Sequence, residues 1–232
     1  MQSIADNITR IEDELREACV RAGRDRAELR LMAVSKFHPR AAVDEALRAG
    51  LRLFGESRVQ EALEKFEAYR TASPEGTELH FIGSLQRNKV KIAAHFFDCI
   101  ESIDRDALID ELGAFCAERE KPLRVLLELN SGEDSKSGYR GIDALLRAAE
   151  KIMAHKGLLL AGLMTMAPFS DDENLIRPAF RNVVNAQRAI EDRFSPSRLS
   201  ILSMGMSNDF KIAIEEGSTL VRIGTALFGE RP

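Results

Sequence analysis

The sequence has few of the residues that form metal centres and disulfide frameworks. Its 232 residues contain three cysteines and four histidines, which are scattered along the chain without a CxxC pair or an HExxH motif. An odd number of distant thiols is typical of a reducing compartment, and isolated histidines do not predict a metal site. We therefore expect a cytoplasmic protein with no resident metal ion.

Long apolar runs and a large excess of one charge are also missing. No stretch approaches the roughly 18–20 apolar residues that cross a bilayer. The first 20 residues mix acids and bases and lack the apolar core of a secretion signal. The formal net charge is −4, which predicts no general attraction to nucleic acid or to an anionic membrane.

The chain does contain a regular alternation of strand-like and helix-like segments. An amphipathic helix is expected over residues 1–22, with apolar side chains at three- and four-residue spacing. Apolar strand-like runs follow at residues 29–36, 51–56, 78–83, 98–103, 122–130, 158–165 and 198–205, and an eighth begins at 218. Helix-period stretches separate them, including one expected over 84–96.

Alternating strands and helices predict a parallel sheet, and eight such units are the number that closes a (β/α)8 TIM barrel. An open doubly wound sheet is the alternative. We favour an α/β fold with a single TIM barrel and an additional N-terminal helix. Because no linker-like tract divides the chain, residues 1–232 are expected to form one domain.

Lys36 is the first candidate for chemistry, because it lies at the end of the first apolar run. In a barrel, functional groups gather where the strands end. A partly desolvated lysine has a lowered pKa, and its neutral amine attacks carbonyls to form Schiff bases. The alternative is a strand-end lysine that simply reaches solvent.

The loops after the seventh and eighth strands are the second candidate. They contain Ser203, Ser207 and Asn208 in one loop and Gly224 and Thr225 in the other. Glycine permits close approach of backbone N–H groups to an anion, hydroxyls add donors, and barrels commonly bind phosphate at this position. Two ordinary turns rich in glycine and serine are the alternative.

Arg222 is the third candidate, because it interrupts the apolar run of the eighth strand. It either points outward between helices or inward to a ligand. If Val221 and Ile223 face the helices, strand alternation directs Arg222 and Gly224 into the barrel. A lysine able to form a Schiff base, a phosphate-binding cup and an inward arginine together suggest pyridoxal 5′-phosphate (PLP).

Seven segments also resemble one known family. The strings AVSKFHP, FGESRVQEAL, HFIGSLQRNKVK, LELNSGEDSKSG, GLMTM, LSMGMSNDF and STLVRIGTALFG occur in order over nearly the whole chain. Their pattern is similar to that of the PLP homeostasis proteins of the YggS/PROSC type, whose fold is similar to the barrel domain of bacterial alanine racemase. The resemblance implies an intracellular PLP-binding protein that stores, delivers or senses the cofactor.

The resemblance also implies roles for individual residues. Lys36 matches the lysine that forms the Schiff base with PLP, and Arg222 matches the arginine against the pyridine nitrogen. The matched phosphate-holding loops contain Ser203, Ser207, Gly224 and Thr225. Ser57 stands where the family usually has asparagine, and because serine is shorter, the contact with the cofactor there is expected to be lost or bridged by water.

The same residues favour a carrier over an enzyme. An arginine at the pyridine nitrogen disfavours protonation of the ring, which makes it a weaker electron sink. Racemases of similar fold add a tyrosine from a second domain as a second base, whereas this chain has only Tyr69 and Tyr139. A racemase-like enzyme completed by a partner remains open, as does an aldolase that uses Lys36 on a phosphorylated substrate.

Two further segments leave alternatives open. Lys136 lies in a polar, glycine-rich loop, and the hypothesis that it is a secondary PLP acceptor, or that it guides the cofactor inward, stands beside the alternative of no special role. The basic cluster within residues 86–91 is either a solvated helix start or a contact for an anion or partner. We expect a monomer whose partners are PLP and PLP-dependent apoenzymes, with no nucleic acid or membrane among them.

Overall fold

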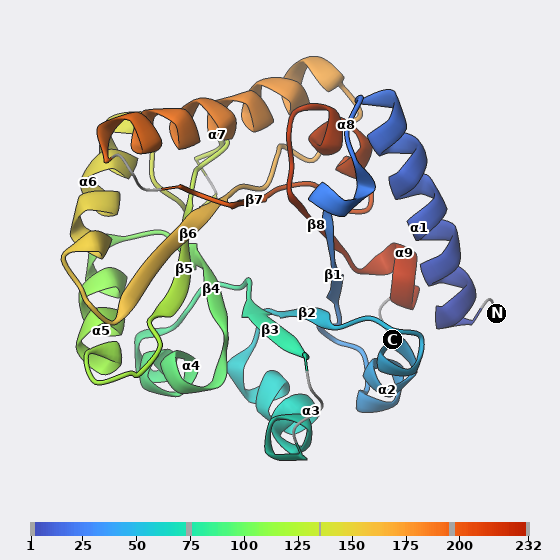
Figure 1. Cartoon of the computed structure of the whole chain (residues 1–232), viewed down its shortest axis with the longest axis horizontal. Coiled ribbons are helices and arrows are strands. Elements are labelled where there is room, and N and C mark those ends of the chain that lie inside the picture. The colour runs from blue at the N-terminus through green and yellow to red at the C-terminus, as the bar shows by residue number, and fades with distance from the viewer. Residues whose placement is uncertain (1–2, 73–75, 135, 195–197, 231–232) are drawn as a thin grey trace.

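Eight parallel strands form a closed barrel in the order β1 to β8 (Figure 1). The computed structural model describes residues 3–72, 76–134, 136–194 and 198–230. Each strand pairs with the next along the chain, and β8 pairs with β1, where Met32 lies beside Arg222. The predicted TIM barrel is therefore confirmed, and the open sheet is excluded.

The strands lie close to the ranges that the sequence predicts. They are β1 (Arg30–Val34), β2 (Leu53–Glu56), β3 (Glu78–Phe81), β4 (Cys99–Ile103), β5 (Leu123–Glu128), β6 (Leu158–Met164), β7 (Ile201–Ser203) and β8 (Leu220–Ile223).

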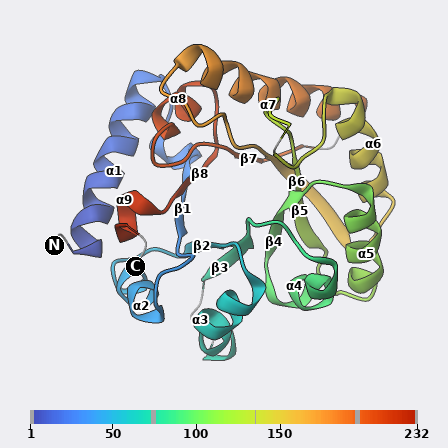
Figure 2. The same ribbon diagram turned by 180° about the vertical axis from the view of Figure 1, so that it is seen from behind.

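The helices form an outer ring around the strands in both views (Figures 1 and 2). They are α1 (Ile4–Arg21), α2 (Arg40–Arg48), α3 (Val59–Ala72), α4 (Val90–Phe96), α5 (Asp106–Cys116), α6 (Ile142–Met153), α7 (Glu173–Arg193), α8 (Phe210–Glu215) and α9 (Thr225–Phe228). Residues 84–96 differ from the single expected helix, because a 3-10 turn (Arg87–Lys89) precedes α4. The short helix α9 was not predicted.

The additional N-terminal helix covers the side of the barrel rather than its end (Figure 1). Ser3 and Asp6 form a reciprocal capping box at the start of α1, and the apolar face of the helix is buried. Asn7 donates from Nδ2 to the Leu227 carbonyl at 2.9 Å, and Arg10 donates to that of Ala226 at 2.9 Å. These bonds connect α1 to α9, which directly follows the last strand.

Strand alternation separates two apolar clusters. Outward-facing side chains such as Ala33 and Val221 pack against the helices. The inward-facing cluster comprises Met32, Val34, Leu53, Cys99, Leu126, Ala161, Met164, Ile201 and Leu220. The same inward phase continues past the strand ends, so it directs side chains there toward the barrel mouth. In the described part of the chain, no helix is long and apolar enough to span a membrane.

Candidate functional site

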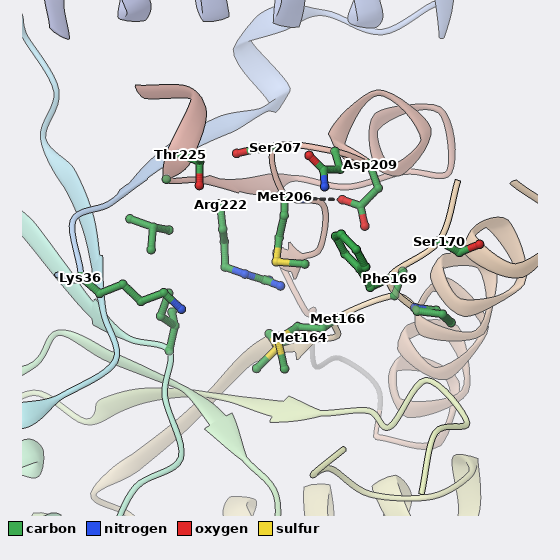
Figure 3. A pocket seen from close by; sticks show the side chains of 16 residues that line it. Lys36, Met164, Met166, Phe169, Ser170, Met206, Ser207, Asp209, Arg222 and Thr225 are labelled. Carbon is green, nitrogen blue, oxygen red and sulfur yellow. Dashed lines mark hydrogen bonds between the residues drawn. The ribbon is translucent and has the colours of Figure 1, made fainter. Parts of the chain in front are cut away.

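A cavity of about 410 Å³ opens at the carboxyl ends of β1, β6, β7 and β8. Figure 3 shows Lys36 extending toward Arg222 from one side, with Ser207 and Thr225 on another wall. The lining residues are Val34, Lys36, Ile82, Met164, Met166, Ala167, Pro168, Phe169, Ser170, Met206, Ser207, Asn208, Asp209, Arg222, Gly224 and Thr225. This volume lies within the roughly 300–1,000 Å³ typical of small-molecule sites.

Lys36 reaches the cavity because it follows β1 by two residues and keeps the inward phase of Val34. Its side chain is half-buried. Helix α3 fixes the backbone on both sides: Lys65 donates from Nζ to the Ser35 carbonyl at 2.7 Å, and Glu61 accepts from the Phe37 N–H. Phe37 has a φ of 69°, an uncommon left-handed conformation for a bulky residue. The turn that presents Lys36 is therefore held by specific side-chain contacts.

Arg222 points into the barrel, as strand alternation predicts. Its Nη1 donates to the carbonyl and to Oγ of Ser203, at 2.6 and 2.7 Å, and its Nη2 donates to the Thr165 carbonyl at 2.8 Å. Burial lowers the pKa of the guanidinium, and nearby carboxylates, Glu101 foremost, oppose that shift. A guanidinium has five N–H donors. These bonds use three, which leaves two for a ligand.

The turn from β7 to α8 supplies the opposite wall. Gly205 has a φ of 98°, and a Cβ there would lie 2.6 Å from Cβ of Ala213, so the turn requires glycine. The Met206 N–H donates to Oδ1 of Asp209 at 2.5 Å, which closes the turn. Among the described residues, neither the Ser207 hydroxyl nor that of Thr225 has a hydrogen-bond partner. Both are available to an anion.

Five of the seven sequence-predicted site residues line this one cavity: Lys36, Ser207, Arg222, Gly224 and Thr225. Ser203 does not, because its side chain is fully buried beneath the cavity, against Arg222. Ser57 lines a second hollow of about 340 Å³ together with Arg58, Gln60 and Lys89. The structure therefore groups five of the candidates and separates two.

The chain matches the alanine racemase N-terminal domain family over residues 4–232. A pyridoxal phosphate homeostasis protein of Vibrio cholerae is 40% identical over 233 residues, which cover 100% of this chain and 98% of that protein. The chain belongs to the pyridoxal phosphate homeostasis protein family. The resemblance seen in the sequence motifs is confirmed.

Solved structures agree with this membership in the pyridoxal phosphate homeostasis protein family. PipY of Synechococcus elongatus PCC7942, solved with PLP bound, superposes with a TM-score of 0.83 at 31% identity, over 98% of this chain and 100% of that one. An alanine racemase of Streptomyces coelicolor superposes with a TM-score of 0.74 at 20% identity, over 99% of this chain and 58% of the racemase. That likeness shows a shared barrel fold.

The other residues considered from the sequence for a role in binding or catalysis lie outside the cavity lining. Lys136 donates from Nζ to the Ala167 carbonyl at 2.8 Å, so it reaches the loop that lines the cavity. Arg87, in the basic cluster, pairs with Glu111 of α5 at 2.5 Å. Tyr139 donates from its hydroxyl to Asp106 at 2.9 Å, and Tyr69 packs against Arg40. The cavity lining includes neither tyrosine.

Sequence reasoning missed part of the wall. Met164 ends β6, Met166 and Phe169 follow it, and all three line the cavity; Phe169 is 89% exposed at the rim. The segment GLMTM contributes to the family resemblance, but the sequence pattern assigned its methionines no role in the site. Asp209 was also missed. It is buried, and burial raises the pKa of its carboxyl.

Proposed function

We propose that this chain binds PLP as a Schiff base on Lys36 and acts in intracellular PLP homeostasis, by storage, delivery or sensing. The observation that supports this most directly is the meeting of Lys36, Arg222 and the turns after β7 and β8 around one cavity. An amine, a buried cation and hydroxyl donors correspond to the aldehyde, ring nitrogen and phosphate of PLP. The bound PLP in the PipY structure supports the same assignment.

The donor set fits the cofactor in detail. Arg222 keeps two N–H donors beyond its protein contacts, and a pyridine nitrogen accepts one. Ser207, Gly224 and Thr225 would bind the phosphate through hydroxyls and backbone N–H groups. Ser203 and Ser57 would act on the cofactor indirectly, because neither lines the cavity. When bound, PLP would supply an electrophilic aldehyde carbon; the protein supplies the amine, the charge and the enclosure.

Retention rather than turnover follows from the charge at the ring nitrogen. A buried guanidinium there disfavours a protonated ring, and an unprotonated ring stabilises a carbanion poorly. A racemase also needs a second base opposite the lysine, and both tyrosines lie outside the cavity lining. These observations support a non-enzymatic role.

A racemase-like activity is the second candidate, because the family model and the fold are shared with alanine racemase. Asp209 is the carboxylate in the cavity lining that such an activity would use as its other base. Its Oδ1 already accepts the Met206 N–H, which closes the turn. The carrier role therefore requires fewer changes to the observed contacts.

The wider parts of the proposal concern domain, location and partners. The closed eight-stranded barrel supports assigning residues 1–232 to one PLP-binding domain. Three buried free cysteines support a reducing, cytoplasmic location. We further propose a monomer that passes PLP to apoenzymes whose identity the fold does not specify.

Borohydride reduction of the purified protein, followed by peptide mass mapping, tests the proposal. We expect a yellow protein with a reduced pyridoxyl label on the peptide that contains Lys36. A colourless protein without label would overturn PLP binding, and label on Lys136 would make that residue a second acceptor. Sustained amino-acid racemisation, lost in Lys36→Ala, would replace the carrier role with the enzymatic one.

A further inference from the structure

A continuous row of polar side chains begins beneath Arg222. The Ser203 hydroxyl accepts from Nη1 of Arg222 at 2.7 Å and donates to Oε2 of Glu101, on β4, at 2.5 Å. All three side chains are buried, and those of Ser203 and Glu101 are 0% exposed. Buried polar groups without partners are costly, and here the Ser203 hydroxyl and the Glu101 carboxylate both have partners within the row.

The row continues from Glu101 to the opposite end of the barrel. Nδ1 of His80 lies 2.6 Å from Oε1 of Glu101, and Nε2 lies 2.6 Å from Oε1 of Glu78. Glu78 begins β3, and it also pairs with Arg30 on β1 and Arg124 on β5. Six strands, β1, β3, β4, β5, β7 and β8, thus contribute to one hydrogen-bonded row through the barrel interior.

The chemistry of the members determines where each proton lies. An ionised carboxylate only accepts hydrogen bonds. His80 faces a carboxylate on each ring nitrogen, so it donates from both and is an imidazolium. The two carboxylates raise the pKa of His80 against its complete burial. The Ser203 proton points to Glu101, which leaves the Ser203 lone pairs for Arg222.

In this arrangement the positive charge of Arg222 is balanced by a carboxylate that does not contact it directly. Among the described residues, no carboxylate pairs directly with Arg222; Glu101 is one hydroxyl away. Asp209 and Glu128 also act on its charge, but neither is hydrogen-bonded to it. A carboxylate in direct contact would occupy the donors that face the cavity. With the Ser203 hydroxyl in between, Glu101 supplies the negative charge without contacting the guanidinium, and those donors stay exposed to a ligand.

We propose that Ser203, Glu101 and His80 are positioning residues that hold Arg222 and set the charge at the ring-nitrogen end of the cavity. This inference rests on the proposed function, and it assigns Ser203 to Arg222 instead of to the phosphate. Since both faces of the Ser203 hydroxyl are engaged in the row, a phosphate contact would break the bond to Glu101.

The experiment compares wild type with Glu101→Gln, which keeps the shape and removes the charge. The visible absorbance of the PLP-loaded protein is titrated against pH to find the midpoint of imine protonation. Removing a negative charge disfavours the protonated imine, so the midpoint falls by about half to one pH unit. Glu101→Asp, which restores the charge, should return the midpoint most of the way to the wild-type value.

Two controls separate this role from general damage. Leu126→Ala loosens the inward apolar cluster and removes no member of the polar row, so it should lower stability but leave the midpoint unchanged. Ser203→Ala should lower the midpoint of imine protonation. The inhibition constant of inorganic phosphate in competition with PLP should stay within twofold of the wild-type value. A tenfold weaker competition by phosphate with an unchanged midpoint would make Ser203 a phosphate ligand and overturn the assignment.

The protonation state of His80 can be measured on the protein before PLP is added. Nitrogen-15 NMR of histidine side chains, assigned with His80→Gln, should show both His80 nitrogens protonated at neutral pH. A neutral His80 would contradict the proton arrangement. If wild type takes up no PLP at all, the proposed function fails; if it does and Glu101→Gln keeps the wild-type midpoint, only this inference fails.

Discussion

The two ends of the barrel interior hold the same kinds of charged side chain in different arrangements. At the amino-terminal end, Glu78 accepts directly from Arg30, Arg124 and His80, so its charge is fully compensated. At the mouth, Arg222 contacts two carbonyls and a hydroxyl, and its nearest carboxylate in the row lies behind Ser203.

This difference shows how one interior serves both stability and binding. At the amino-terminal end, which we call the closed end, direct ion pairs occupy the donors and acceptors of the charged side chains, so few remain for a ligand. Separating the arginine from its carboxylate by one hydroxyl keeps the charge buried and the donors available. The mouth also contains Lys36 and the two turns rich in glycine and serine, whereas the closed end contributes no residue to the cavity lining.

Replacing a charged side chain at each end gives the largest expected contrast. Lys36→Ala should abolish both the visible absorbance and the borohydride-fixed label, because no other amine lines the cavity among the described residues. Arg30→Ala, at the closed end, should keep both. Equal labelling of the two variants, measured by intact-protein mass, would show that capture does not depend on the mouth.

The turn after β7 gives the next largest effect. Gly205→Ala places a Cβ 2.6 Å from that of Ala213 at a φ of 98°, so we expect a loss of about 2–4 kcal/mol in urea unfolding. PLP affinity should also fall about tenfold, because Ser207 follows in the same turn. Gly50→Ala is the matched control: it has the same φ of 98° with nothing within 4 Å.

Gly50→Ala should therefore report the backbone cost alone, about 1–2 kcal/mol, with unchanged PLP affinity. If both variants lose the same stability, the close contact with Ala213 contributes nothing. If Gly205→Ala binds PLP as wild type does, the turn after β7 is not part of the binding site.

At the closed end, Glu78→Gln should cost about 2 kcal/mol in the free energy of unfolding at pH 7. This is less than the loss of a fully buried partner, because the Glu78 side chain is 20% exposed. The surface pair of Asp13 and Arg16 is the control, and Asp13→Asn should change stability by less than about 0.5 kcal/mol. If Glu78→Gln and Asp13→Asn lowered the free energy of unfolding equally, the ion pairs of Glu78 would stabilise the fold no more than a surface ion pair does.

The acid dependence of stability sharpens the same prediction. Arg30, Arg124 and His80 hold the pKa of Glu78 below its usual range despite partial burial. A depressed folded pKa contributes stability that is fully present above the unfolded pKa of about 4.3 and is lost as pH falls toward the folded value. Glu78→Gln should therefore show a shallower loss of stability below about pH 4.5 than wild type does.

Much of the fold and part of the site could be predicted because they depend on local patterns. Each of the eight strands lies inside its expected range, and Gly50 and Gly217 end α2 and α8 with left-handed backbones. The inward direction of Arg222 follows from strand alternation alone. Lys36 and the two turns were found because they depart from apolar packing at strand ends.

The polar row could not be predicted, because it depends on how strands meet across the barrel. Glu78, His80 and Ile82 share the inward phase of one strand, which the sequence does indicate. The pairing of His80 with Glu101, and of Glu101 with Ser203, requires the stagger and closure of the barrel. Ser203 was assigned to the phosphate for that reason: its loop is visible in the sequence, but the carboxylate beneath it is not.

The smallest expected effect concerns Ser57 and tests whether the binding site extends beyond the cavity at the barrel mouth. Ser57 lines a separate hollow with Gln60, Gln86 and Lys89, so Ser57→Asn, which restores the residue usual in the family, should change PLP affinity by less than twofold. Spectrophotometric titration with PLP measures this, with Ser84→Asn as the control in the same hollow. A gain of tenfold in Ser57→Asn alone would mean that an amide reaches the cofactor there. The hollow that Ser57 lines would then belong to the binding site, and the mouth of the barrel would bind PLP over a wider surface than the cavity alone.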